Sequence, residues 1–170
     1  MATILGPKRG AAKSLAPDGF ERVLAIGALV LLGFVLAALI RGRPYWGQIP
    51  TMVWLHLATM TVALGLTPVM LLRRRGDRPH RALGTIWVAA MVLTALISFG
   101  IRSVNHGGFS IIHILSVWVL IQVPLIWWSA RTHRVAQHRS SVRGMVTGAL
   151  LIAGFFTFPF NRMLGQFLFG

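Results

Sequence analysis

Cysteine is absent from this chain of 170 residues, so disulfides, zinc–thiolate sites, iron–sulfur clusters and thiolate catalysis are excluded. Acidic residues are nearly absent: Asp18, Glu21 and Asp77 are the only three, and none falls inside an apolar run. This scarcity argues against a carboxylate proton relay, a cation transporter built on a buried acid and a di-iron carboxylate site. It also argues against a hydrolase triad, because the serines of the apolar runs have no buried acid partner.

Apolar residues make up 55% of the sequence, and the mean hydropathy is +0.71. These values indicate an integral membrane protein and not a soluble domain. The net charge of +14 could point to a nucleic-acid partner. However, the arginines stand between apolar runs, as in basic loops beside membrane helices, so we expect no nucleic acid.

The predicted fold class is all-α: an integral membrane bundle of five transmembrane helices. Residues 1–19 are expected to form a flexible basic tail, and residues 20–170 a single transmembrane domain. Each apolar run is close to the ~20 residues that a bilayer core requires. The helices are predicted at residues 22–40, 51–72, 79–101, 109–130 and 140–160. The last could begin as early as Val135, because no glycine or proline interrupts that stretch.

The distribution of positive charge predicts the orientation in the membrane. Only four of the 17 lysines and arginines lie beyond the tail and the loops after the second and fourth helices. They are Arg41, Arg43, Arg102 and Arg162. The positive-inside rule therefore places the N-terminus in the cytoplasm and, after five crossings, the C-terminus on the opposite side.

A helix pair occurs twice with histidines at matching points. Each unit has a histidine early in an apolar helix, a proline past its middle, an arginine-rich turn and a His-Arg pair that opens the next helix. The members are His56, Pro68 and His80-Arg81 in the first unit and His113, Pro124 and His138-Arg139 in the second. Both units start on the same side of the membrane, so we predict a parallel internal repeat.

The predicted topology sorts the four histidines into two layers. His56 and His113 lie near the non-cytoplasmic surface, and His80 and His138 lie at the cytoplasmic ends of their helices. Two facing neutral imidazoles are a common axial ligand pair for a b-type haem iron, so each layer is a candidate haem site. Arginines such as Arg81 and Arg139 could then pair with the haem propionates.

Structural alternatives remain open for both layers. A neutral histidine can simply form a hydrogen bond between helices, which is the alternative for His56 and His113. A histidine beside arginines at the membrane surface can be solvated or contact lipid phosphates, which is the alternative for His80 and His138. His106 and His133 fall outside the repeat and are expected to be bystanders.

The sequence from His56 to Arg143 resembles a bacterial membrane-protein family of unknown function. The resemblance is carried by Arg78-Pro-His-Arg-Ala-Leu-Gly84, by Gly107-Gly108-Phe109 before His113, and by His138-Arg139. It implies a multi-pass protein of the bacterial inner membrane and supplies no activity.

The order of histidines on four successive helices is also distantly similar to that of the ascorbate-reducible di-haem cytochrome b family. That resemblance implies one haem between His56 and His113, a second between His80 and His138, and electron transfer across the bilayer. Here His80 follows His56 by 24 residues, a shorter spacing than in that family, which moves the second pair to the membrane edge.

Three functions are compatible with the sequence. The first is an electron carrier with haem b between His56 and His113, and with a second haem between His80 and His138 as a further option. It acts between a quinone or other small reductant and an acceptor. The second is a non-enzymatic membrane scaffold or an accessory subunit of a larger membrane complex, with structural histidines. The third is a transporter, for which five helices and no buried acid offer little support. The lipid bilayer is a partner in every case. The pattern does not fix the rotation of the helices that carry His80 and His138.

Overall fold

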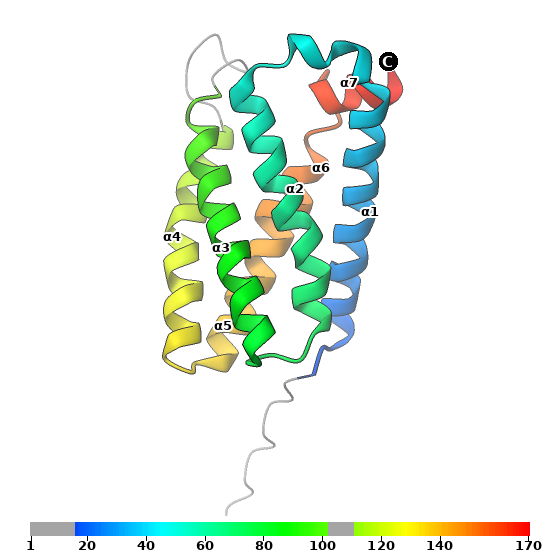
Figure 1. Ribbon diagram of the computed structural model, residues 1–170. Coiled ribbons are helices and arrows are strands. Elements are labelled where there is room, and N and C mark those ends of the chain that lie inside the picture. Colours follow the sequence, from blue (N-terminus) through cyan, green and yellow to red (C-terminus); the bar gives the residue numbers. More distant parts are fainter. Residues whose placement is uncertain (1–15, 102–110) are drawn as a thin grey trace, which may run out of the picture.

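The computed structural model describes residues 16–101 and 111–170, which form helices and connecting turns without a strand (Figure 1). The four longest helices are α1 (Gly19–Arg41), α2 (Thr51–Leu72), α3 (Arg78–Ser98) and α4 (Ile111–Arg131). A fifth helical segment begins as α5 (Val135–Met145) and continues through the π-helical η2 (Val146–Ile152) into α6 (Ala153–Phe155). The short 3-10 helix η1 (Arg43–Gln48) links α1 to α2, and α7 (Met163–Phe169) ends the chain.

Two aspartates define where helices begin. Asp18 caps α1, and it forms a capping box with Glu21, in which each side chain accepts the backbone N–H of the other residue. Asp77 caps α3 by accepting the backbone N–H of His80 at 2.7 Å. The Asp18 cap explains why α1 begins at Gly19, three residues before the predicted start.

The other predicted boundaries agree closely with the structure or differ by a few residues. Helix α2 has its predicted bounds, and α3 ends at Ser98 because the chain turns at Phe99. Helix α5 begins at Val135, at the early start that the uninterrupted stretch allowed. Helix α7 was not predicted, and the segment that contains His106 and Phe109 lies outside the described residues.

The helices form a closed ring. Each of α1 to α5 packs against the next in the chain, and η2 packs back onto α1 (Figure 1). Alanines with no exposed surface allow α1 to approach its neighbours closely: Ala25, Ala28 and Ala38. Helix α7 packs against α1 at the end of the bundle opposite the start of α1, where Tyr45 of η1 stacks on Phe167.

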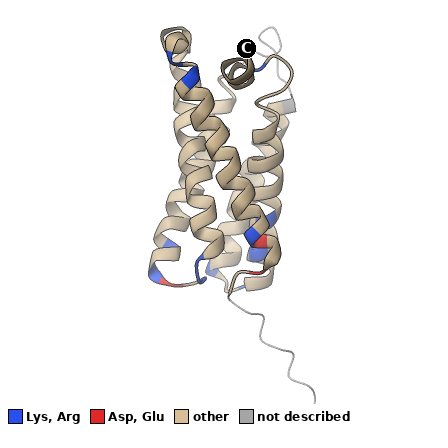
Figure 2. Ribbon diagram, turned by 90° about the vertical axis from the view of Figure 1, so that its right-hand side faces the viewer, with Lys and Arg blue, Asp and Glu red and all other residues tan. Residues whose placement is uncertain are grey.

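Four helices are long and apolar enough to cross a membrane: α1, α2, α3 and most of α4. Their outward surfaces are apolar too, since Val23, Ile40 and Ile114 are each more than 60% exposed. The charged residues gather near the two ends of the bundle (Figure 2). These features indicate a membrane protein, as predicted.

The expected fifth crossing corresponds to the segment from α5 to α6, which is not among the four membrane-spanning candidates. Its first turns carry His138, Arg139 and Arg143, and the π-helix interrupts its regular α-helical structure. The fifth crossing and the internal repeat therefore stay predictions.

Candidate ligand-binding site

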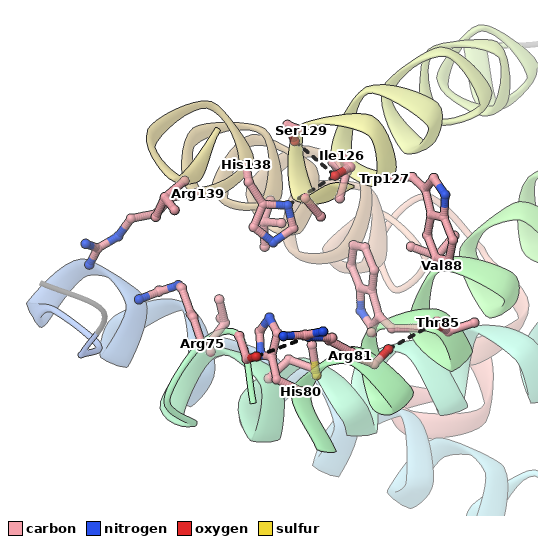
Figure 3. A pocket seen from close by; sticks show the side chains of 18 of the residues that line it. Arg75, His80, Arg81, Thr85, Val88, Ile126, Trp127, Ser129, His138 and Arg139 are labelled. Carbon is pink, nitrogen blue, oxygen red and sulfur yellow. Dashed lines mark hydrogen bonds between the residues drawn. The ribbon is translucent and has the colours of Figure 1, made fainter. Parts of the chain in front are cut away.

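His80 and His138 face each other at the end of the bundle where the chain enters α1 (Figure 3). Their ring centroids are 6.5 Å apart, and the ring planes make an angle of 74°. Each histidine lies in the first turns of its helix, His80 behind the Asp77 cap of α3 and His138 near the start of α5. The sequence predicted this pair, and the structure determines the helix rotations that bring it together.

A cavity of about 600 Å³ adjoins both histidines. Residues of α2, α3, α4 and α5 line it, and its walls are mainly apolar. The apolar lining residues include Met70, Leu71, Trp87, Val88, Ile126, Trp127, Val142 and Val146. This volume is within the range of ~300–1,000 Å³ that is typical of ligand and cofactor pockets.

The hydrogen bonds of His138 determine which ring nitrogen is available. Its Nδ1 lies 3.1 Å from the carbonyl oxygen of Ile126, which can only accept, so Nδ1 carries the proton and donates. The neutral ring then keeps the lone pair of Nε2. A histidine that binds a metal commonly has this arrangement, because the hydrogen bond fixes both the tautomer and the ring orientation.

His80 presents a different signal. Its Nδ1 is buried and has no hydrogen-bond partner within the described part of the chain. Burying a polar atom without a partner costs roughly 1–3 kcal/mol, so such an atom calls for an explanation. A ligand between the two rings is one explanation.

The cavity also has a charged edge. Four arginines line it (Arg75, Arg81, Arg131 and Arg139), while Glu21 is the only acidic residue of the lining. Arg81 is exposed, and its Nε donates to the carbonyl of Gly76 at 3.1 Å. With neutral histidines, this lining suits an amphipathic ligand that has an apolar body and anionic groups.

Glu21 is fully buried at the centre of an arginine cluster that the sequence pattern did not predict, so the expectation of no buried acid is wrong. Arg139 binds its carboxylate through two nitrogens, with Nε to Oε1 at 2.8 Å and Nη2 to Oε2 at 2.9 Å. Arg75 and Arg143 also pair with Glu21, and Asp18 pairs with Arg139 and Arg143. The cluster thus joins α1 to α5 and to the loop between α2 and α3. The Asp18-x-x-Glu21 spacing of a capping box was the sequence signal for part of it.

Asp18 and Asp77 lie outside the candidate membrane spans and have lowered pKa values. The backbone N–H of Glu21, followed by Arg143 and Arg139, lowers the pKa of Asp18. The backbone N–H of His80, followed by the Arg73 guanidinium, lowers the pKa of Asp77. Both carboxylates are therefore negatively charged at neutral pH, which favours their capping role.

The second predicted pair has different contacts. His56 Nδ1 lies 3.1 Å from Ser98 Oγ, and Ser98 donates its proton to the carbonyl of Thr94. His56 therefore donates to Ser98, at the C-terminal end of α3. His113 is buried, and its ring lies 5.9 Å from that of Phe99 at the same end of α3. Among the described residues, the histidine rings in mutual contact are those of His80 and His138.

The remaining predicted site residues are the two arginines. Both Arg81 and Arg139 line the cavity, but the Glu21 carboxylate already engages Arg139. The described residues contain no group of three or more histidines and carboxylates that could hold a metal ion.

No protein-family model, curated protein or solved structure matches this chain.

Proposed function

We propose that this chain is a membrane electron carrier that binds one haem b between α3 and α5, where His80 and His138 would hold the haem iron. The observation that carries the proposal is the facing of two imidazole rings across a largely apolar cavity. The pair at the membrane edge, and not His56 with His113, is thus the first candidate.

The ring separation agrees with two axial ligands on one metal. A metal–imidazole nitrogen bond is about 2 Å long, and the ring centre lies about 1 Å beyond that nitrogen. Two such ligands on opposite sides place the ring centroids about 6 Å apart, close to the 6.5 Å between His80 and His138. The ring angle of 74° is compatible with this arrangement, because each ring can rotate about its own metal bond.

The donor set favours haem over a bare metal ion. Two imidazoles alone do not complete a tetrahedral or octahedral site, and the described residues offer no third histidine or carboxylate ligand. A haem needs only two protein ligands, because the macrocycle supplies four nitrogens of its own.

The residues around the pair have distinct expected roles. Trp87, Val88 and Ile126 line the cavity with apolar surface and would shield a bound haem from water. The Ile126 carbonyl orients the His138 ring, and an acceptor of this kind also raises the basicity of the imidazole. Arg81, exposed at the cavity, is the arginine best available for a propionate, whereas Arg139 is held by Glu21. Bound haem would supply reversible one-electron chemistry, and a quinone or other small reductant is the proposed electron source.

The test is a reduced-minus-oxidised absorbance spectrum of protein purified from haem-supplemented cells, together with a haem count by pyridine haemochrome. We expect one haem per chain, and we expect its loss in both His80→Ala and His138→Ala. The matched control is His133→Ala, an exposed histidine that also lines the cavity; this variant should keep the haem, which would show that the loss is specific to the facing pair.

Other outcomes decide between the alternatives. Two haems per chain would extend the site to His56 and His113, as the resemblance implies. A haem lost only in His56→Ala and His113→Ala would move the site to that layer. A colourless protein would refute the cytochrome proposal and leave the membrane scaffold or accessory subunit as the leading function.

A further inference from the structure

Six exposed arginines gather at the end of the bundle that carries the histidine pair. They lie at the start of α1, between α2 and α3, early in α3, at the end of α4, and between α4 and α5. These arginines are Arg22, Arg74, Arg78, Arg81, Arg131 and Arg134. No ion pair in the described ranges, 16–101 and 111–170, includes any of them.

The sequence contains no further acidic side chain for these arginines. Its three carboxylates are already engaged: Asp77 with Arg73, and Asp18 and Glu21 with Arg75, Arg139 and Arg143. Residues 1–15 and 102–110 contain no acidic residue either, and the C-terminus lies at the opposite end of the bundle (Figure 1). The counter-charge for this surface must therefore come from outside the chain.

Two of these arginines lie over tryptophan rings. The guanidinium carbon of Arg131 lies 4.9 Å from the Trp127 ring centroid, and that of Arg134 lies 4.3 Å from the Trp128 ring centroid. Both tryptophans are partly exposed at the C-terminal end of α4, one of the candidate membrane spans. Tryptophan favours the headgroup level of a bilayer, and an arginine stacked on it there is held at the depth of the lipid phosphates.

We propose that Arg131–Trp127 and Arg134–Trp128 form a binding site for the phosphate of acidic phospholipids at this membrane surface. The occupant is a lipid headgroup and not a nucleic acid, because the charges are seated on aromatic rings at the end of an apolar spanning helix. Surface arginines attract anionic lipids additively, and the aromatic rings fix the two guanidinium groups in position. Arg131 and Trp127 also line the cavity of the candidate haem site, but the proposal rests on the exposed arginine–tryptophan pairs and not on haem binding.

The experiment is a lipid titration of the purified full-length protein in a neutral detergent, with bound lipids counted by native mass spectrometry. Phosphatidylglycerol is the acidic probe, and phosphatidylcholine is the zwitterionic one. We expect the wild type to bind phosphatidylglycerol more tightly than phosphatidylcholine. Salt at about 0.5 M strongly screens surface charges, so it should weaken this preference.

Two double variants locate the site. Arg131→Gln with Arg134→Gln should weaken phosphatidylglycerol binding about tenfold or more, as expected from the loss of two surface cations. The matched control is Arg41→Gln with Arg43→Gln, which removes two exposed arginines from the opposite end and should leave the high-affinity binding unchanged. Arg131→Lys with Arg134→Lys keeps the charge and should retain most of the binding.

The proposal is overturned if the wild type binds both lipids equally, or if the two glutamine variants lose binding to the same extent. The circular dichroism melting curve of each variant checks folding. If the Arg131/Arg134 variant does not fold, the lipid preference of the wild type and its salt dependence still decide the outcome.

Discussion

Single residues at the histidine end have roles that depend on their partners. His138 is fixed by the Ile126 carbonyl, and Glu21 is fixed by three arginines, although neither environment follows from the residue type alone. A buried carboxylate of this kind holds its arginines in place, and its removal leaves positive charges close together without compensation.

We expect Glu21→Gln to destabilise the protein by about 3–5 kcal/mol, the usual cost of removing one partner from a buried ion pair. The measurement is the midpoint of thermal unfolding in detergent micelles. In the double variant Glu21→Gln with Arg139→Gln, the second substitution should cost much less than Arg139→Gln does in the wild type. Equal costs in the two backgrounds would show that the two side chains are not coupled.

At the scale of elements, the caps and the π-helix shape the cavity. The Asp77 cap starts α3 so that His80 falls in its first turn. The π-helical η2 begins where the α5 segment leaves the cavity, and its first residue, Val146, lines that cavity. A π-helix is rare and often occurs at functional sites, which agrees with the position of the candidate site.

The Asp77 cap predicts a pH dependence. The pKa of Asp77 is lower in the folded protein than in the unfolded chain, because the backbone N–H of His80 and the Arg73 guanidinium favour the carboxylate. Its stabilising effect is therefore complete above the unfolded pKa of about 3.9, and it is lost as the pH falls through the lower folded pKa.

The measurement is the unfolding midpoint of the wild type and of Asp77→Asn, followed downward from about pH 6 through the unfolded pKa of about 3.9 to about pH 2. The difference between the two proteins should shrink as the pH falls, because asparagine can cap a helix but does not titrate. A difference that stays constant over this range would contradict the role assigned to the Asp77 carboxylate.

At the scale of the whole molecule, the ring of helices separates two unlike ends. All three carboxylates and the histidine pair lie at one end, with the α2–α3 and α4–α5 connections. Helices η1 and α7 lie at the other end, where Tyr45 stacks on Phe167. If both ends contact water on opposite sides of a membrane, the chain crosses five times.

The absence of cysteine makes this topology directly testable. Single cysteines at Arg74 and Ala136 should be protected from a membrane-impermeant maleimide in intact cells, and cysteines at Gly47 and Gln166 should be labelled. All four positions are exposed. Protection of Gln166 together with labelling of Gly47 would place α7 and η1 on opposite sides, and it would refute the five-crossing prediction.

The sequence by itself determined the elements. Charge-free apolar runs flanked by arginines indicated membrane helices, and the residues from Thr51 to Leu72 were assigned to their observed bounds because proline precedes them and an arginine run follows. The C-terminal helix α7 was not predicted from the sequence, since its seven residues are too few to show a clear periodicity.

Only the tertiary structure decided which residues meet. Spacing along the chain favoured His56 with His113 as the first haem pair and His80 with His138 as the second, but it could not fix the rotation of each helix about its axis. That rotation depends on packing around the whole ring, which turns His80 toward His138 and leaves His56 bonded to Ser98. The burial of Glu21 has the same origin, because its three arginines come from segments 54 to 122 residues away and meet only when α1 closes against α5.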